Sequence, residues 1–112
     1  MAHLQIAASL SRRGEMARAL PIAEAAMRES KDVAVRAPAA VIRGESLLAK
    51  KEWDDAVLAF VEVPVLYPQE RPLLPRALLG KARALLGGDD FSAARATLEK
   101  LRQRYPAALE SK

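Results

Sequence analysis

The sequence predicts an all-α protein, a right-handed α-solenoid in which three helix hairpins, six helices in all, stack in series. Two observations lead to this prediction. Within residues 53–68 and 91–106, apolar residues recur at steps of 3 and 4, as on one face of an α-helix. The second set repeats the first at one constant displacement, and a fixed repeat period is typical of stacked-repeat proteins. The matching positions are Trp53, Ala56, Phe60, Val63, Tyr67 and Pro68 with Phe91, Ala94, Leu98, Leu101, Tyr105 and Pro106.

The first hairpin is expected within residues 2–31, as a weaker copy of the other two. Its second helix follows the turn at 11–14 and repeats the spacing of 3, 4 and 3. The step from Ala19 to its counterpart Ala56 is one position shorter than the later period. The residues that mark the two helices of this hairpin are Leu4, Ala7 and Leu10, then Met16, Ala19, Ala23 and Ala26.

The second and third hairpins are expected within residues 34–68 and 72–106. Their leading helices are predicted over 38–49 and 75–86, because proline is tolerated at the start of a helix. Gly87-Gly88-Asp89-Asp90 is predicted to end one helix and cap the next. Glycine accepts the left-handed conformation, and aspartate accepts hydrogen bonds from free backbone N–H groups. Lys50-Lys51-Glu52 is expected to link the helices of the middle hairpin in the same way.

Two prolines fall inside predicted second helices. Pro21 lies in the first hairpin and Pro64 in the second. An interior proline removes a backbone hydrogen bond and usually kinks a helix. Because the apolar spacing continues in phase across both prolines, we expect bends rather than breaks.

Composition predicts a single domain over residues 1–112, with a short tail at 107–112. Hydrophobic residues make up 51% of the chain but aromatic residues only 4%, so we expect a core of Ala, Leu and Val. The absence of cysteine excludes disulfides and thiolate metal sites. The net charge of +4 comes from 18 basic and 14 acidic side chains that are interspersed. This mixing makes nucleic-acid binding a less favoured alternative.

No catalytic, metal or cofactor site is predicted. His3 is the only histidine, so the serines have no histidine partner that would activate them. Asp54-Asp55 and Asp89-Asp90 stand where helices are expected to begin, which explains them as capping residues. Gly87-Gly88 lacks the Lys and Ser/Thr of a phosphate-binding loop.

The repeated residues resemble the tetratricopeptide repeat family. The pattern consists of Ala56-x3-Phe60-x7-Pro68 and Ala94-x3-Leu98-x7-Pro106, with Gly44 and Ala82 as small residues in the first helices. The resemblance implies a non-catalytic scaffold that binds a protein or peptide partner. That family ordinarily has a period of 34, and the four surplus residues fall within 69–74, where they would add a turn before the next helix. The longer spacing with Tyr-Pro endings is similar to bacterial cell-envelope members, such as the Tol–Pal coordinator and the lipoprotein of the barrel assembly machinery.

A partner segment is expected in the concave groove, which the first helix of each hairpin lines. Arginine suits bidentate contact with carboxylates, so an acidic or C-terminal peptide is one ligand class. The alternative is that Glu45 neutralises Arg12 or Arg83 within the protein. The Lys and Asn cluster of chaperone-binding family members is not found at comparable places. The predicted groove residues are Leu4, Ala8, Arg12, Val41, Glu45, Leu48, Arg76, Leu79 and Arg83.

A second interpretation is an architectural or self-associating segment of a larger envelope protein. The tail at 107–112 is too short to cover the last hairpin, which predicts a homo-oligomer or a missing neighbouring repeat. No apolar run approaches the ~20 residues of a membrane span. The start of the chain has no basic segment followed by an apolar stretch, so the default expectation is a cytoplasmic protein. A periplasmic or cell-envelope location is the alternative if the sequence is an excerpt.

Overall fold

The computed structural model describes residues 16–107, and all the elements assigned in this range are helical. This confirms the all-α prediction. The expected helix around Leu4, Ala7 and Leu10 and its turn at 11–14 lie outside the described residues. The elements are α2 (Met16–Glu29), α3 (Val33–Ala49), α4 (Trp53–Leu66), the 3₁₀ turn η1 (Arg71–Leu73), α5 (Leu74–Gly87) and α6 (Phe91–Arg104).

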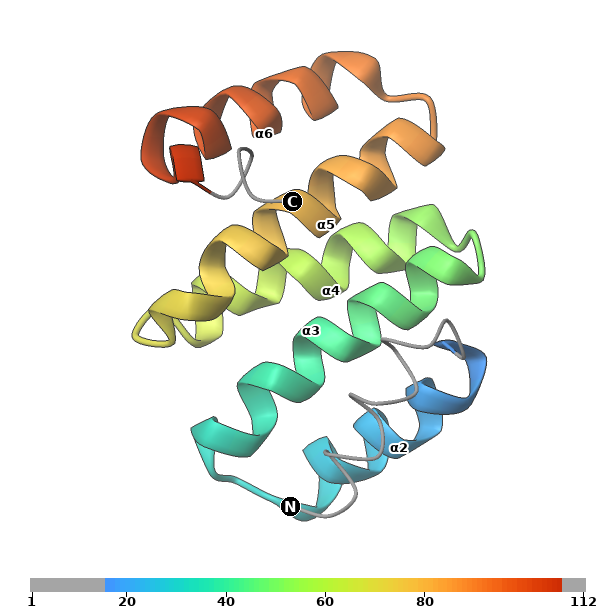
Figure 1. Cartoon of the computed structure of the whole chain (residues 1–112). Coiled ribbons are helices and arrows are strands. Elements are labelled where there is room, and N and C mark those ends of the chain that lie inside the picture. The colour runs from blue at the N-terminus through green and yellow to red at the C-terminus, as the bar shows by residue number, and fades with distance from the viewer. Residues whose placement is uncertain (1–15, 108–112) are drawn as a thin grey trace.

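The helices follow one another in space as they do along the chain, from α2 at the bottom to α6 at the top of Figure 1. Each helix packs mainly against its neighbours in sequence, and α3 also contacts α5. Serial packing of this kind distinguishes a stack of hairpins from a bundle around one axis. The complete solenoid of three hairpins and six helices stays a prediction.

The start predicted for α3 is wrong. The helix begins at Val33, well before Pro38. The carboxylate of Asp32 accepts a hydrogen bond from the backbone N–H of Ala34 at 3.0 Å and so caps the helix. Pro38 therefore lies inside the helix, where its missing N–H leaves the carbonyl of Ala34 without the usual donor.

The interior prolines do not break their helices. Pro21 lies within α2, and Pro64 lies within α4. Each helix continues through its proline, α2 for eight residues to Glu29 and α4 for two residues to Leu66. The four surplus residues of the repeat behave as expected, since η1 adds a 3₁₀ turn in front of α5, with the N–H of Leu73 donating to the carbonyl of Glu70 at 3.0 Å.

The two linkers within hairpins differ from their prediction in one respect. Asp90 accepts a hydrogen bond from the N–H of Ala93 at 3.3 Å, which confirms the cap on α6. The left-handed residue there is Asp89 rather than a glycine.

The predicted capping role of Asp54-Asp55 is wrong. The N-cap position of α4 is Glu52, without a side-chain hydrogen bond, and both aspartates lie in the first turn, where negative charge complements the helix dipole.

Small residues allow the helices to approach closely around one aromatic ring. Phe60 is 1% exposed and lies between α3 and α5. A Cβ atom at Gly44 would come within 2.8 Å of the Phe60 ring, and one at Gly80 within 2.3 Å. Both distances are shorter than any packed contact, so only glycine fits at these two positions. The core therefore runs continuously from α3 through α4 to α5.

Candidate partner-binding surface

Five of the nine predicted groove residues make up a candidate patch on α3 and α5, since their spacing of 3 and 4 puts them on one face of each helix. We call this patch the α3–α5 face. Val41 is not part of it, and the predicted residues Leu4, Ala8 and Arg12 lie outside the described residues. The members of the face are Glu45, Leu48, Arg76, Leu79 and Arg83.

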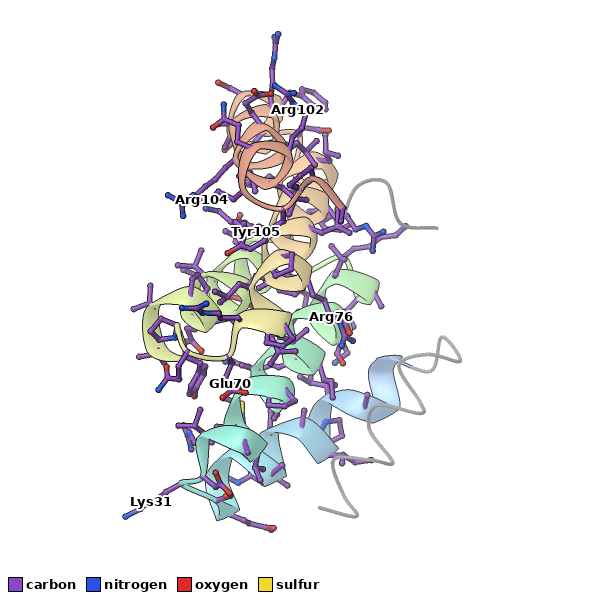
Figure 2. The ribbon with its side chains drawn as sticks, turned by 60° about the vertical axis from the view of Figure 1, so that its left-hand side comes forward. Lys31, Glu70, Arg76, Arg102, Arg104 and Tyr105 are labelled. Carbon is purple, nitrogen blue, oxygen red and sulfur yellow. The ribbon has the colours of Figure 1, made fainter. Side chains whose placement is uncertain are left out.

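Glu45 and Arg76 join the two helices of this face. Arg76 donates from Nε to Glu45 Oε2 at 2.8 Å and from Nη2 to Oε1 at 2.7 Å, a bidentate pair. Glu45 is thus neutralised within the protein by Arg76, whereas the alternative interpretation named Arg12 or Arg83. Arg12 lies outside the described residues. Figure 2 shows Arg76 on the opposite side of the stack from Arg104. Because the Arg76 side chain is 48% exposed, the pair itself is part of the accessible surface.

The other members of the face are apolar or cationic. Leu48 and Leu79 are half-buried, and Arg83 is exposed. The assignment of Val41 to the groove is wrong, since this residue is 0% exposed and packs in the same core cluster as Leu20 and Ala77. The physical reason is that α3 contacts α2, α4 and α5, so more of its circumference is buried than packing within one hairpin requires.

Arg36, which the sequence analysis did not single out, joins three helices. Its guanidinium donates to the carbonyl oxygens of Met27 and Ser30 at the end of α2, and to the hydroxyl of Tyr67 after α4. A cation is favourable at this end of a helix, where carbonyl groups lack partners. The Tyr-Pro ending of the repeat was the signal that such a partner exists. The counterpart of Arg36 in the third hairpin is Leu74, whose side chain cannot donate a hydrogen bond to Tyr105.

The last hairpin leaves an apolar edge uncovered within the described part of the chain. Trp53 is half-buried because its indole lies against Gly87, where a Cβ atom would come within 2.5 Å of the ring. Phe91 occupies the same place in the next repeat but is 62% exposed. The two aromatic residues therefore differ only in whether a following helix covers them.

The described residues hold no group of three His, Cys, Asp or Glu side chains that could bind a metal ion. None of the helices between residues 16 and 107 has the length and apolar character needed to cross a bilayer. His3, the single histidine of the sequence, lies outside this range. The buried hydroxyls of Ser46 and Thr97 each donate to a backbone carbonyl one helical turn earlier, which leaves them a structural role.

Comparison with known proteins identifies one family. Residues 76–108 match the tetratricopeptide repeat, a stretch that contains most of α5 and all of α6. This match supports the tetratricopeptide resemblance that the residue pattern indicated. Neither the curated proteins nor the solved structures yield a match.

Proposed function

We propose that this chain, whose residues 76–108 match the tetratricopeptide repeat, is a non-catalytic scaffold that binds a segment of a protein partner along the α3–α5 face. Tetratricopeptide repeats generally mediate protein–protein interaction. The observation that supports this face is the bidentate pair of Glu45 and Arg76, which holds two successive first helices in one surface. Successive first helices form the inner surface that helical repeat proteins present to ligands.

The chemistry of the α3–α5 face indicates what it would bind. Leu48 and Leu79 supply partly exposed apolar area, and Arg83 supplies a guanidinium that can bind a carboxylate with two hydrogen bonds. Arg76 is already engaged by Glu45, so its role would be to hold Glu45 and shape the surface. A segment with apolar side chains and one carboxylate fits this combination. Leu4, Ala8 and Arg12 remain part of the proposed groove.

A capture experiment tests this proposal. The whole chain is immobilised, retained proteins are identified, and the affinity of each purified candidate is then measured. The double substitution Arg76→Ala/Arg83→Ala is expected to lower the affinity for a genuine partner by about tenfold or more. Arg95→Ala/Arg104→Ala, which removes two exposed arginines of α6, is the charge-matched control and should leave affinity unchanged. Equal affinity of the wild type and the Arg76/Arg83 variant would rule out the α3–α5 face.

A second candidate function is self-association through the uncovered edge of α6. Its support is the exposed ring of Phe91, whose counterpart Trp53 is covered by the next helix. Analytical ultracentrifugation over a range of concentrations should show association that Phe91→Asp abolishes. Leu58→Asp is the matched control, because Leu58 is 63% exposed on α4, away from this edge. A chain that remains monomeric at high concentration would exclude this function.

The charge arrangement opposes the nucleic-acid alternative. Three arginines, one on each of α3, α5 and α6, are paired with carboxylates, so these three are poorly placed for phosphates. Arg43 lies 3.8 Å from both Glu24 and Glu62, Arg76 pairs with Glu45, and Arg102 pairs with Glu99. Binding of a partner segment along an apolar face should accordingly respond little to salt, whereas phosphate binding would weaken steeply.

A further inference from the structure

A pocket of about 280 Å³ opens between α4, α5 and α6. It lies on the side of α5 opposite to the α3–α5 face, because Lys81 stands two positions from both Leu79 and Arg83 in a helix of about 3.6 residues per turn. The sequence analysis did not anticipate this pocket. Its lining includes Phe60, Val61, Pro64, Val65, Lys81 and Lys100.

The repeat period shows what is unusual about the two lysines. In the preceding repeat, Arg43 stands between two carboxylates, with Glu24 and Glu62 each 3.8 Å away. The step of 37 that relates Ala19 to Ala56 turns Glu24 into Val61, and the step of 38 that relates Trp53 to Phe91 turns Arg43 into Lys81. The same step turns Glu62 into Lys100, so one of the two carboxylates is replaced by a second cation.

A counterpart of the pocket exists in the preceding repeat, where side chains of the protein supply both positive and negative charge. That hollow is lined by Glu24, Met27, Arg28 and Arg43. Met27 and Arg43 correspond to Pro64 and Lys81 one repeat later, at the steps of 37 and 38. The earlier hollow thus contains a carboxylate beside its cations. In the later pocket two lysines, Lys81 and Lys100, belong to the lining without a carboxylate beside them, and such a pair of cations favours an anion.

The remainder of the pocket is apolar and accessible. Val65 is 67% exposed at its rim, and Leu58, Val61 and Val65 share one face of α4 because they are spaced by 3 and 4. Leu58 is 63% exposed, so the apolar stripe extends beyond the pocket. Pro64 has no N–H to donate to the carbonyl of Phe60, so this carbonyl lacks the hydrogen bond that it would normally accept within the helix. A volume of about 280 Å³ is small for a drug-sized ligand and suits a single large side chain.

We propose that this pocket is a second docking site, which receives an acidic segment of a protein partner. One bulky apolar side chain of the segment enters the pocket over Val61 and Val65, and an adjacent carboxylate lies between Lys81 and Lys100. The site is separate from the α3–α5 face, since the two lie on opposite sides of α5. A partner that engages both would hold the third hairpin from two sides.

Selection from a random peptide library displayed on phage, with the whole chain as target, tests the proposal. Enriched peptides are expected to contain a bulky apolar residue flanked by Asp or Glu. Their affinity, measured by fluorescence anisotropy, should fall by about tenfold or more for Lys81→Glu/Lys100→Glu. Lys81→Arg/Lys100→Arg should retain binding. Lys50→Glu/Lys51→Glu, the same charge change in an exposed linker, should alter affinity by less than about twofold.

The outcomes separate this site from the other proposals. Arg83→Glu should leave the selected peptides bound, and loss of binding in that variant would place them on the α3–α5 face and overturn the second site. Enriched peptides without acidic residues, a selection that yields no binder, or equal affinity for Lys81→Glu/Lys100→Glu would also overturn it. A uridine oligonucleotide that binds through the two lysines more tightly than the peptides would assign the pocket to phosphates instead. None of these results depends on the capture experiment for the α3–α5 face.

Discussion

Lys51 and Asp89 adopt the same left-handed backbone conformation, with φ of 64° and 65°, and they hold the same position in successive repeats. Each ends a helix in a Schellman motif, in which the following amide donates back to a carbonyl in the last turn of the helix. The period seen in the apolar residues is therefore also a period of the backbone, although the two side chains are chemically unlike. The two bonds are Glu52 N–H to Leu47 at 3.0 Å and Asp90 N–H to Leu85 at 2.8 Å.

Lys51→Gly should stabilise the protein. A residue with a Cβ atom in the left-handed conformation costs about 1–2 kcal/mol, which glycine avoids. Glycine also loses more backbone entropy on folding, so we expect the free energy of unfolding to rise by roughly 0.5–1 kcal/mol. Asp89→Gly should gain less, because aspartate tolerates this conformation better than lysine. Urea denaturation measures both. Lys50→Gly is the control, since Lys50 has a right-handed φ of −82°. A stabilising Lys50→Gly or a neutral Lys51→Gly would contradict the explanation.

Gly80→Ala should destabilise the fold, although alanine is ordinarily the better helix former. The added methyl group would come within 2.3 Å of the Phe60 ring, which is held on its other side by Gly44. Overpacking of this kind costs about 1–3 kcal/mol. Gly80→Ala should lower the free energy of unfolding by less in a Phe60→Leu background, because leucine lacks the rigid ring. Additive effects of the two substitutions would show that the ring is not the cause.

The pair of Glu45 and Arg76 should contribute little to stability despite its good geometry. The Arg76 side chain is 48% exposed and that of Glu45 is 20% exposed, so water and salt screen the interaction. A double-mutant cycle with Glu45→Gln and Arg76→Gln is expected to give a coupling below about 1 kcal/mol, and less at high salt. A salt-independent coupling of about 3 kcal/mol would instead indicate a buried pair.

Glu99 should titrate below the ordinary range of a glutamate. Hydrogen bonds from Arg102, at 3.2 and 2.5 Å, are the main cause that lowers the pKa of Glu99, with the positive charge of Arg102 adding to it. Because the pKa is lower in the folded state, the stabilisation is present above the unfolded-state pKa and is lost as the pH falls through the folded-state value. Carbon-detected NMR titration should show the pKa rise towards its ordinary value in Arg102→Gln. Lys100→Gln, a neighbouring charge removal, should change it less.

The local sequence predicted the faces of the helices well. Ala56, Phe60 and Val63 are buried, as are their counterparts Ala94 and Leu101. These residues recur at the period of the helix itself, so their shared face is a property of one segment of chain. Helix starts were less predictable, because Asp32, not Pro38, sets the start of α3. A cap is one hydrogen bond made by a single side chain. Where two residues that can begin a helix stand close together, as Asp32 and Pro38 do, the sequence does not decide at which one the helix begins.

The candidate site was only partly within reach of the sequence. Spacing places Glu45 and Arg76 on corresponding faces of their helices, but the bond between them requires α3 and α5 to approach. The same holds for Lys81 and Lys100, which belong to different helices and were not singled out. Val41 shows the converse, since its spacing matched the groove while contacts from neighbouring helices buried it. Side chains on different helices meet through packing, which no single periodicity describes.

The amino-acid sequence alone determined that the chain is helical, that its pattern recurs with a fixed period, and which face of each second helix is apolar. Only the tertiary structure decided that Trp53 is covered while Phe91 is exposed, although both hold the same place in the repeat. The physical reason is that helix formation and its apolar period arise from neighbours along the chain. Exposure, ion pairing and pocket shape arise from whichever helix lies alongside.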